Sequence, residues 1–191
     1  MIQKVPVWLE AYDVAIRQYY RDDMAELVDE DVQTKHFTYY MPHQVVVREA
    51  SRTTKLRRSA TKLRVVFDAS SHASGSLSLN DNLQSGPYLT ADLVALLLNF
   101  RRHNVALVAD MENAFLHIQV QESDRDALRF LWYDRIPRPQ EDTPNIVTFR
   151  MKRVPFGITS SPFLLAATLK HHFVNMAHKF PTSSKLPSES T

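Results

Sequence analysis

Glycine is scarce in this chain, with three residues in 191 where about 7% is usual. Glycine is the residue that takes up tight backbone turns without a steric cost, so each one marks a position that matters for the fold. Gly75 lies in the small polar stretch SSHASGS, and Gly86 precedes a proline in QSGPY, so both predict loops or turns. Gly157 lies in VPFGITSSP, directly before a sequence that is typical of a helix start.

The composition is that of a globular protein, with 44% hydrophobic and 23% charged residues. Its length predicts one domain or two small ones. No apolar run approaches the eighteen residues of a transmembrane helix, and the N-terminus lacks the pattern of a signal peptide. There are no cysteines, which excludes disulfides and thiolate zinc sites and suits a reducing intracellular compartment.

The net charge of +2 hides a separation of charge along the chain. Residues 10–31 hold eight acidic side chains against two arginines, and residues 48–64 hold seven basic side chains against one glutamate. A solvated face is the ordinary explanation of such a run. The basic block also fits a surface that binds phosphates. The eight histidines have no ligand-like spacing and predict surface or core positions.

Hydrophobic periodicity predicts helices and strands in mixed order. Three helices are expected: one over residues 12–31, one over residues 91–104 with Thr90 as its N-cap and Asn104 at its C-cap, and one that begins at Pro162. Strands are expected at 39–49, 62–67, 105–109, 128–133 and 146–151. In the second strand, alternation predicts that Lys62, Arg64 and Asp68 point away from the buried face.

The stretch NVALVADMENAFLHIQV is the strongest candidate for chemistry. Its run VALVA fits a strand buried on both faces, which would place Asp110 at the carboxyl edge of a sheet, where ligands collect. Magnesium prefers carboxylate and phosphate oxygens. A turn or helix cap is the ordinary role of such an aspartate. The basic strand upstream and the Pro-Phe-Gly turn downstream, which leads into a helix N-terminus, favour a phosphate site instead.

Five blocks of the sequence closely resemble the reverse transcriptase of BEL/Pao-type LTR retrotransposons: TKLRVVFDAS, SLNDNLQSGP, VALVADMENAFLHIQV, DRDALRFLW and RVPFGITSSPFLLAATLKHH. The resemblance covers residues 36–181. It implies an α+β fold, the fingers and first part of the palm of a right-hand polymerase, with a mainly antiparallel palm sheet packed on helices. Residues 1–35 would form an acidic helical segment, and residues 182–191 a disordered tail. The implied activity is RNA-directed DNA polymerisation, a nucleotidyl transfer that uses two magnesium ions.

The resemblance also implies roles for single residues. Asp110 would be the first metal-binding, catalytic aspartate, and the carbonyl of Met111 would contact a metal. The other residues would contact the incoming nucleotide: Lys62 and Arg64 at its phosphates, the amides of Asn113 and Ala114 around the triphosphate, Phe115 as the steric gate under the sugar, and Phe156 with Gly157 beside the templating base. Phenylalanine suits a gate because it is bulky and offers a 2′-hydroxyl no hydrogen bond.

One feature departs from the family pattern. Thr-Lys-Leu-Arg occurs twice, at 54–57 and 61–64, where one copy is expected. We assign the phosphate role to the copy that adjoins VVFDAS, which leaves Lys55 and Arg57 as cations of uncertain use.

The Tyr-x-Asp-Asp spelling of a polymerase metal motif occurs at residues 20–23. It precedes Asp110, whereas the family order places it afterwards, and its flanks are charged and helical. A palm with permuted order is the alternative, but we interpret the match as a coincidence in an exposed acidic helix. The family's own hairpin is expected about where the chain ends, so we expect little or no polymerase activity from this chain alone, because two-metal catalysis needs several carboxylates.

Three hypotheses remain open at this stage. The chain is a part of a retrotransposon polymerase, a non-catalytic nucleic-acid-binding remnant of a transposon polyprotein, or a truncated product whose apolar palm strand is left exposed. The resemblance implies RNA or DNA template-primer and deoxynucleoside triphosphates as partners, besides RNase H, integrase and protease domains of the polyprotein, and no membrane. It also implies a role in DNA integration and transposition, and a cytoplasmic location in virus-like particles.

Overall fold

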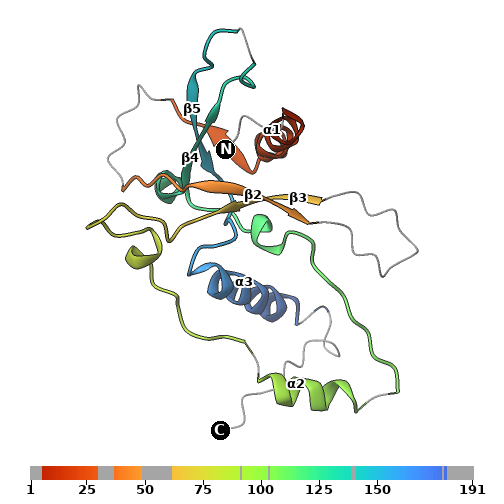
Figure 1. The fold of residues 1–191 in the computed structure, drawn as a ribbon. Coiled ribbons are helices and arrows are strands. Elements are labelled where there is room, and N and C mark those ends of the chain that lie inside the picture. The colour runs from red at the N-terminus through yellow and green to blue at the C-terminus, as the bar shows by residue number, and fades with distance from the viewer. Residues whose placement is uncertain are drawn as a thin grey trace.

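The computed structural model describes residues 6–29, 37–48, 62–90, 92–102, 104–138, 141–177 and 179. Figure 1 shows their arrangement. The described elements, with η for 3₁₀ helices, are α1 (Pro6–Arg21), β1 (Ala25–Leu27), β2 (His43–Arg48), β3 (Lys62–Phe67), η2 (Asn80–Asn82), α2 (Leu93–Phe100), η3 (Ala114–His117), η4 (Glu122–Leu128), β4 (Arg129–Tyr133), β5 (Ile146–Met151) and α3 (Ser161–Met176). The strands pair antiparallel in two sheets, which confirms the predicted α+β class.

The larger sheet has the strand order β1-β5-β4. β4 and β5 form a hairpin in which Phe130 pairs with Phe149. The carboxylate of Asp134 closes the hairpin by accepting hydrogen bonds from the amide of Asn145 at 3.0 Å and from its side chain at 2.9 Å. The three-residue strand β1 then covers one edge of β5. The strands predicted at 128–133 and 146–151 are therefore present.

The smaller sheet is the hairpin of β2 and β3, in which Val45 pairs with Val65. The segment that leads into β2 runs beside β4, because the amide of Met41 donates to the carbonyl of Arg129 at 2.7 Å. β2 begins at His43, directly after Pro42, which the sequence predicts to break the entry into the strand expected within 39–49. Pro42 lacks the N–H group that a strand needs.

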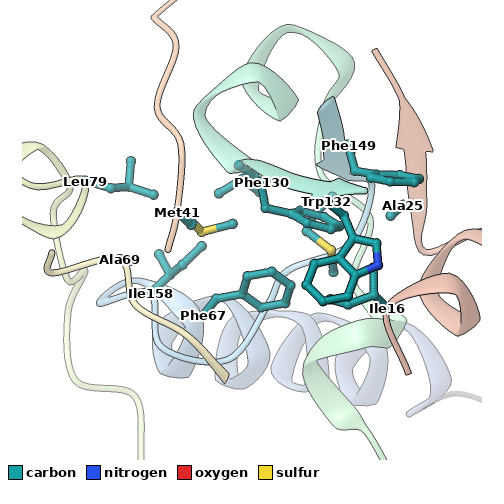
Figure 2. Close-up of a cluster of buried hydrophobic side chains, with 12 residues drawn as sticks. Ile16, Ala25, Met41, Phe67, Ala69, Leu79, Phe130, Trp132, Phe149 and Ile158 are labelled. Atoms are coloured by element: carbon teal, nitrogen blue, oxygen red, sulfur yellow. The ribbon is translucent and has the colours of Figure 1, made fainter. Parts of the chain in front are cut away.

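An aromatic core lies between the two sheets and α1 (Figure 2). The ring of Phe130 lies 5.1 Å from that of Phe67 and is stacked at 5.5 Å on that of Phe149, measured between centroids. Ile16 from α1 and Trp132 from β4 are also buried here. Each aromatic side chain that leaves water in such a cluster contributes on the order of 2 kcal/mol. This core joins residues from both ends of the described chain.

The helix predicted over residues 12–31 is wrong in its C-terminal half. α1 ends at Arg21, and the chain reverses through Asp23, which has a positive φ of 56°. The amide of Met24 donates to the carbonyl of Tyr19 at 2.8 Å, which terminates the helix. The residues that follow form β1, because pairing with β5 satisfies their backbone hydrogen-bonding groups. A longer helix would leave this edge of β5 uncovered.

The buried strand predicted over residues 105–109 is also wrong. The segment forms no strand, and Leu107 is 91% exposed. Among the described residues, none forms a backbone hydrogen bond with residues 105–111. An apolar run becomes a central strand only where neighbouring strands accept and donate its backbone hydrogen bonds.

α2 is shorter than predicted and lies apart from the sheets (Figure 1). Asp92, not Thr90, caps the helix, since its carboxylate accepts the amide of Val94 at 3.0 Å. The C-cap is Arg101, not Asn104. All eight residues of α2 are exposed although most of them are apolar. Among the described helices, none has the length and apolar character needed to cross a membrane.

Candidate functional site

Two phenylalanines from distant parts of the chain meet on the surface. Phe115 lies in η3, and Phe156 lies in the turn between β5 and α3. Their ring centroids are 5.8 Å apart, with the planes inclined at 55°. Phe115 is half-buried, while Phe156 is 70% exposed. Both residues were predicted to contact a nucleotide, and the structure brings them together.

Backbone pairing explains why these rings meet. The chain after η3 runs antiparallel to the chain after β5, with Gln119 opposite Arg153. The amide of Val120 donates to the carbonyl of Lys152 at 2.8 Å, and the amide of Val154 donates to the carbonyl of Ile118 at 3.0 Å. In an antiparallel pair, each step back on one strand matches a step forward on the other. The positions of the two phenylalanines therefore fall almost opposite each other.

Gly157 brings the end of β3 to the same place. Its φ is +103°, and a Cβ atom on this residue would lie 2.7 Å from the carbonyl oxygen of Phe67. A residue with a side chain would therefore have both an unfavourable φ and a steric clash. Arg64 lies three residues before Phe67, on the exposed side of the strand, as alternation predicted. Arg64 therefore lies about 10 Å along the strand from Phe67, the span of three strand residues.

Several of the predicted basic residues lie, in whole or in part, outside the described residues. The backbone of Lys62 pairs with that of Arg48 at the start of β3, but its side chain lies outside the described part of the molecule. The first Thr-Lys-Leu-Arg copy, with Lys55 and Arg57, and the tail at 182–191 also lie outside the described residues. Arg64 is thus the predicted phosphate-binding cation whose side chain can be placed.

Asn113 and Ala114 stand at the start of η3. Asn113 has a left-handed conformation with φ 53°, and its carbonyl accepts the amide of Leu116 at 2.8 Å. Asparagine tolerates this conformation better than most residues with a side chain. The two residues therefore turn the chain into the short helix that carries Phe115. The role of their amides around a triphosphate stays a prediction.

Asp110 and Met111 are exposed and directly follow residues 105–109, which were expected to form a strand. Asp110 therefore does not lie at the edge of a sheet in this structure. Within the described ranges, no group of three or more histidine, aspartate or glutamate side chains is arranged to hold a metal. The metal role of Asp110 stays a prediction.

The Tyr-x-Asp-Asp stretch lies at the end of α1 and in the turn after it, not wholly in a helix. Asp22 accepts a hydrogen bond from the side chain of Gln18 at 2.7 Å. Asp23 forms an ion pair with Lys152, and the hydrogen bond from that ammonium group holds the pKa of the Asp23 carboxyl below its usual value. Both carboxylates thus have partners within the chain, and the pair of Asp23 with Lys152 connects the turn after α1 with the residue that follows β5.

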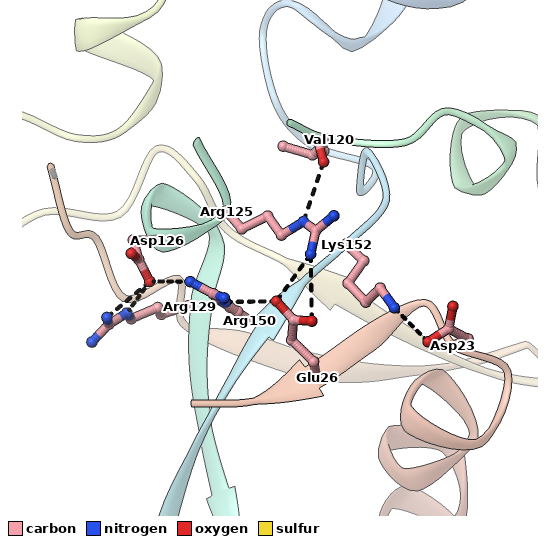
Figure 3. A network of polar contacts seen from close by, with 8 residues as sticks. All are labelled: Asp23, Glu26, Val120, Arg125, Asp126, Arg129, Arg150 and Lys152. Carbon is pink, nitrogen blue, oxygen red and sulfur yellow. Dashed lines mark hydrogen bonds and ion pairs between the residues drawn. The ribbon is translucent and has the colours of Figure 1, made fainter. Parts of the chain in front are cut away.

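An ionic network that the sequence did not reveal connects β1 with β4, β5 and η4 (Figure 3). Glu26 accepts hydrogen bonds from Arg150 at 2.7 Å and from Arg125 at 3.2 Å. Asp126 accepts from Arg129 at 2.8 Å and from Arg150 at 3.1 Å. Burial alone would raise the pKa of Asp126, but the hydrogen bonds from the two arginines hold it below its usual value.

His43 connects α1 with both sheets. The hydroxyl of Tyr12 hydrogen-bonds Nδ1 of His43, and Nε2–H of His43 donates to the carbonyl of Leu131 at 3.0 Å. The ring also lies 5.5 Å from that of Trp132. Burial lowers the pKa of His43, and the hydrogen bond to Leu131 offsets this in part. This histidine is half-buried and packs against the aromatic core.

Asn80 is the residue near the aromatic pair that sequence reasoning missed. Its side-chain amide nitrogen donates to Ser70 Oγ at 2.8 Å and to the carbonyl of Gly157 at 3.1 Å, and its Oδ1 accepts the amide of Thr159 at 2.9 Å. An asparagine in a polar loop predicts a local turn. No local signal indicates hydrogen bonds to a segment 77 residues away.

Residues of the described chain thus form an exposed aromatic pair, a glycine turn held by an asparagine, and a strand with an outward arginine. This arrangement can stack a flat ring and attract a phosphate. Comparison with protein-family models gives no match for this chain, and comparison with curated proteins gives none either.

Proposed function

We propose that this chain binds nucleic acid and nucleotides as the fingers and first palm segment of a BEL/Pao-type RNA-directed DNA polymerase. The observation that carries the proposal is the contact between Phe115 and Phe156, whose ring centroids lie 5.8 Å apart. The resemblance assigned both residues to one nucleotide site although they are 41 positions apart in the sequence. The backbone pairing that brings the two rings together is thus consistent with a shared site.

The aromatic pair has the physical properties of a stacking surface. Phe156 offers an exposed ring, and Phe115 supports it from η3. Every nucleobase has a flat face that stacks on such a ring, which contributes about 1–3 kcal/mol for each base in proteins that bind single strands. Stacking of this kind tolerates any base sequence, as a polymerase requires of its template site.

The phosphate part of the proposal rests on Arg64. Its guanidinium lies on the exposed face of β3, and the end of that strand touches the turn of Phe156 and Gly157. A guanidinium matches the geometry of phosphate oxygens and stays charged at neutral pH. A nucleotide stacked on Phe156 would therefore have a cation on the neighbouring strand.

A second function, non-catalytic binding of nucleic acid, is favoured by the exposure of Asp110. The proposed polymerase reaction joins a primer 3′-hydroxyl to the α-phosphate of a deoxynucleoside triphosphate with release of pyrophosphate. The resemblance implies that two magnesium ions would assist this step. The stacking surface does not depend on Asp110, so the same residues would serve a protein that binds without catalysis.

Two assays test these proposals. Fluorescence anisotropy of a labelled 12-nucleotide oligothymidylate should show that Phe156→Ala weakens binding about 5- to 150-fold. Phe173→Ala should leave binding unchanged, because this exposed residue lies about 18 Å along α3 from its start. Arg64→Ala should lower the slope of log affinity against log salt by about 0.7. Equal affinities of the wild type and Phe156→Ala would refute the stacking site.

Primer extension with magnesium separates the two functions. Synthesis that Asp110→Asn abolishes would support the polymerase, and binding without synthesis would support the non-catalytic alternative. The double variant Asp22→Asn and Asp23→Asn should keep any synthesis that the wild type shows. If it loses synthesis as Asp110→Asn does, our interpretation of the N-terminal motif as a coincidence is overturned.

A further inference from the structure

We infer that Asn80 is a positioning residue that holds the turn at 155–159 so that Phe156 faces Phe115. The inference deepens the proposed function, on which its meaning for ligand binding rests. The positioning itself depends only on contacts within the chain.

The side chain of Asn80 connects three segments at once. It reaches Ser70 in the loop after β3, and both Gly157 and Thr159 in the turn, over distances of 2.8, 3.1 and 2.9 Å. An asparagine side chain has two donor hydrogens and one carbonyl oxygen, and here both kinds of group are used. Its own amide also donates to the carbonyl of Ala69 at 3.0 Å, which fixes the backbone from which the side chain extends.

The turn is anchored on both sides of Phe156. On the N-terminal side, Ser161 Oγ donates to the carbonyl of Pro155 at 3.0 Å. On the C-terminal side, Asn80 binds the carbonyl of Gly157 and the amide of Thr159. The phenylalanine itself is 70% exposed, so the direction of its ring depends on the contact with Phe115 and on the backbone of the turn. Asn80 makes two of the hydrogen bonds that hold this backbone after the ring.

Loss of Asn80 should therefore affect Phe156 more than it affects the fold. Gly157 lies against the carbonyl of Phe67, and Ser161 is buried, so the turn keeps these two anchors. A ring that becomes free to move must be ordered again when a base stacks on it. Ordering one such side chain corresponds to an affinity loss of about three- to ten-fold.

The chain offers a matched control in the same 3₁₀ helix. Asn82 lies two residues on, and its side chain donates to the carbonyl of Ser78 at 2.8 Å. Asn82→Ala therefore removes a hydrogen bond from η2 without a change in the turn at 155–159. A general loss of stability should affect both variants, whereas a positioning effect should be confined to Asn80→Ala.

The first test needs no ligand. The ring proton resonances of Phe156, in protein with ¹³C-labelled phenylalanine, report the ring current of Phe115. We expect Asn80→Ala to move them toward their positions in Phe115→Ala, while Asn82→Ala leaves them in place. Unchanged Phe156 resonances in Asn80→Ala would overturn the inference. Should that variant fail to fold, Asn80→Asp keeps the acceptor for Thr159, loses the donor to Gly157, and must give a shift in the same direction.

The second test uses the labelled 12-nucleotide oligothymidylate. Asn80→Ala should weaken binding about three- to ten-fold with an unchanged salt slope. In the Phe156→Ala background, the same substitution should have no further effect, because it acts through that ring. Additive losses would overturn the inference. If Phe156→Ala alone leaves binding unchanged, the proposed function fails, and the resonance test decides the positioning role by itself.

Discussion

Replacement of Asp126 by asparagine is the sharpest test of the ionic network. The carboxylate is 2% exposed and lies between the guanidinium groups of Arg129 and Arg150 (Figure 3). Asparagine has nearly the same shape but no charge, so Asp126→Asn leaves two arginines without their shared anion. A charge that remains buried after its partner is removed is strongly destabilising.

The size of the effect follows from the remaining contacts. Removal of one partner from a buried ion pair costs about 3–5 kcal/mol. Arg150 keeps Glu26 at 2.7 Å, and Arg129 keeps the hydroxyl of Tyr40 at 3.2 Å. Because these contacts remain, we expect the lower end of that range, a loss of about 3 kcal/mol in the free energy of unfolding. With a urea dependence of about 2 kcal/mol per molar, the unfolding midpoint should fall by about 1.5 M.

Urea unfolding followed by tryptophan fluorescence measures the shift of the midpoint that Asp126→Asn causes, since Trp132 is buried in the same sheet. Asp124→Asn is the control, because Asp124 is exposed in η4, where it accepts a hydrogen bond from Ser123 at 3.1 Å. Its midpoint should stay within about 0.3 M of the wild type. Equal midpoints for the wild type and Asp126→Asn would refute the argument that the network stabilises the fold.

Two other substitutions test the turn and the histidine. Gly157→Ala should lower the free energy of unfolding by more than 2 kcal/mol, by the order of magnitude of backbone strain plus a clash, because a Cβ atom would lie 2.7 Å from the carbonyl of Phe67. Gly75→Ala, with φ +83° and open space, should have a smaller effect in the same urea titration. The lowered pKa of His43 means that the unfolded chain binds its proton more readily. The contribution of neutral His43 to the free energy of unfolding should therefore be fully present above about pH 6.5, the ordinary pKa of histidine. It should be lost as the pH falls through the lower pKa that His43 has in the folded chain. His43→Gln should flatten this dependence of the urea midpoint, and an unchanged slope would contradict the assignment.

The strands that pair within hairpins were predictable from the sequence. β3, β4 and β5 carry the alternation or β-branched and aromatic runs that predict strands, and their partners lie close in the sequence or across one loop. The outward position of Arg64 followed from the same alternation. In these places local propensity and tertiary pairing favour the same conformation, so a single sequence is sufficient.

Elements that depend on a distant partner were not predictable in this way. β1 exists because β5 offers an edge and because Glu26 meets two arginines about 100 or more residues away. The run at 105–109 has the composition of a central strand, yet its conformation is set by the neighbours that pair with it. Asn80 belongs to the same class, since its role depends on hydrogen bonds to residues 157 and 159.

The two halves of the candidate site therefore differ in how firmly the fold supports them. Phe156, Gly157 and Asn80 are held by backbone pairing, a close contact with β3 and three hydrogen bonds. Asp110 lies on an exposed apolar segment that forms no backbone hydrogen bond with the described residues. Binding of a base needs a rigid ring, whereas metal-assisted transfer needs carboxylates held within fractions of an ångström. The hydrogen bonds of Asn80 and the contact of Gly157 with β3 hold the backbone that carries Phe156, whereas the described residues form no such contacts with the backbone that carries Asp110.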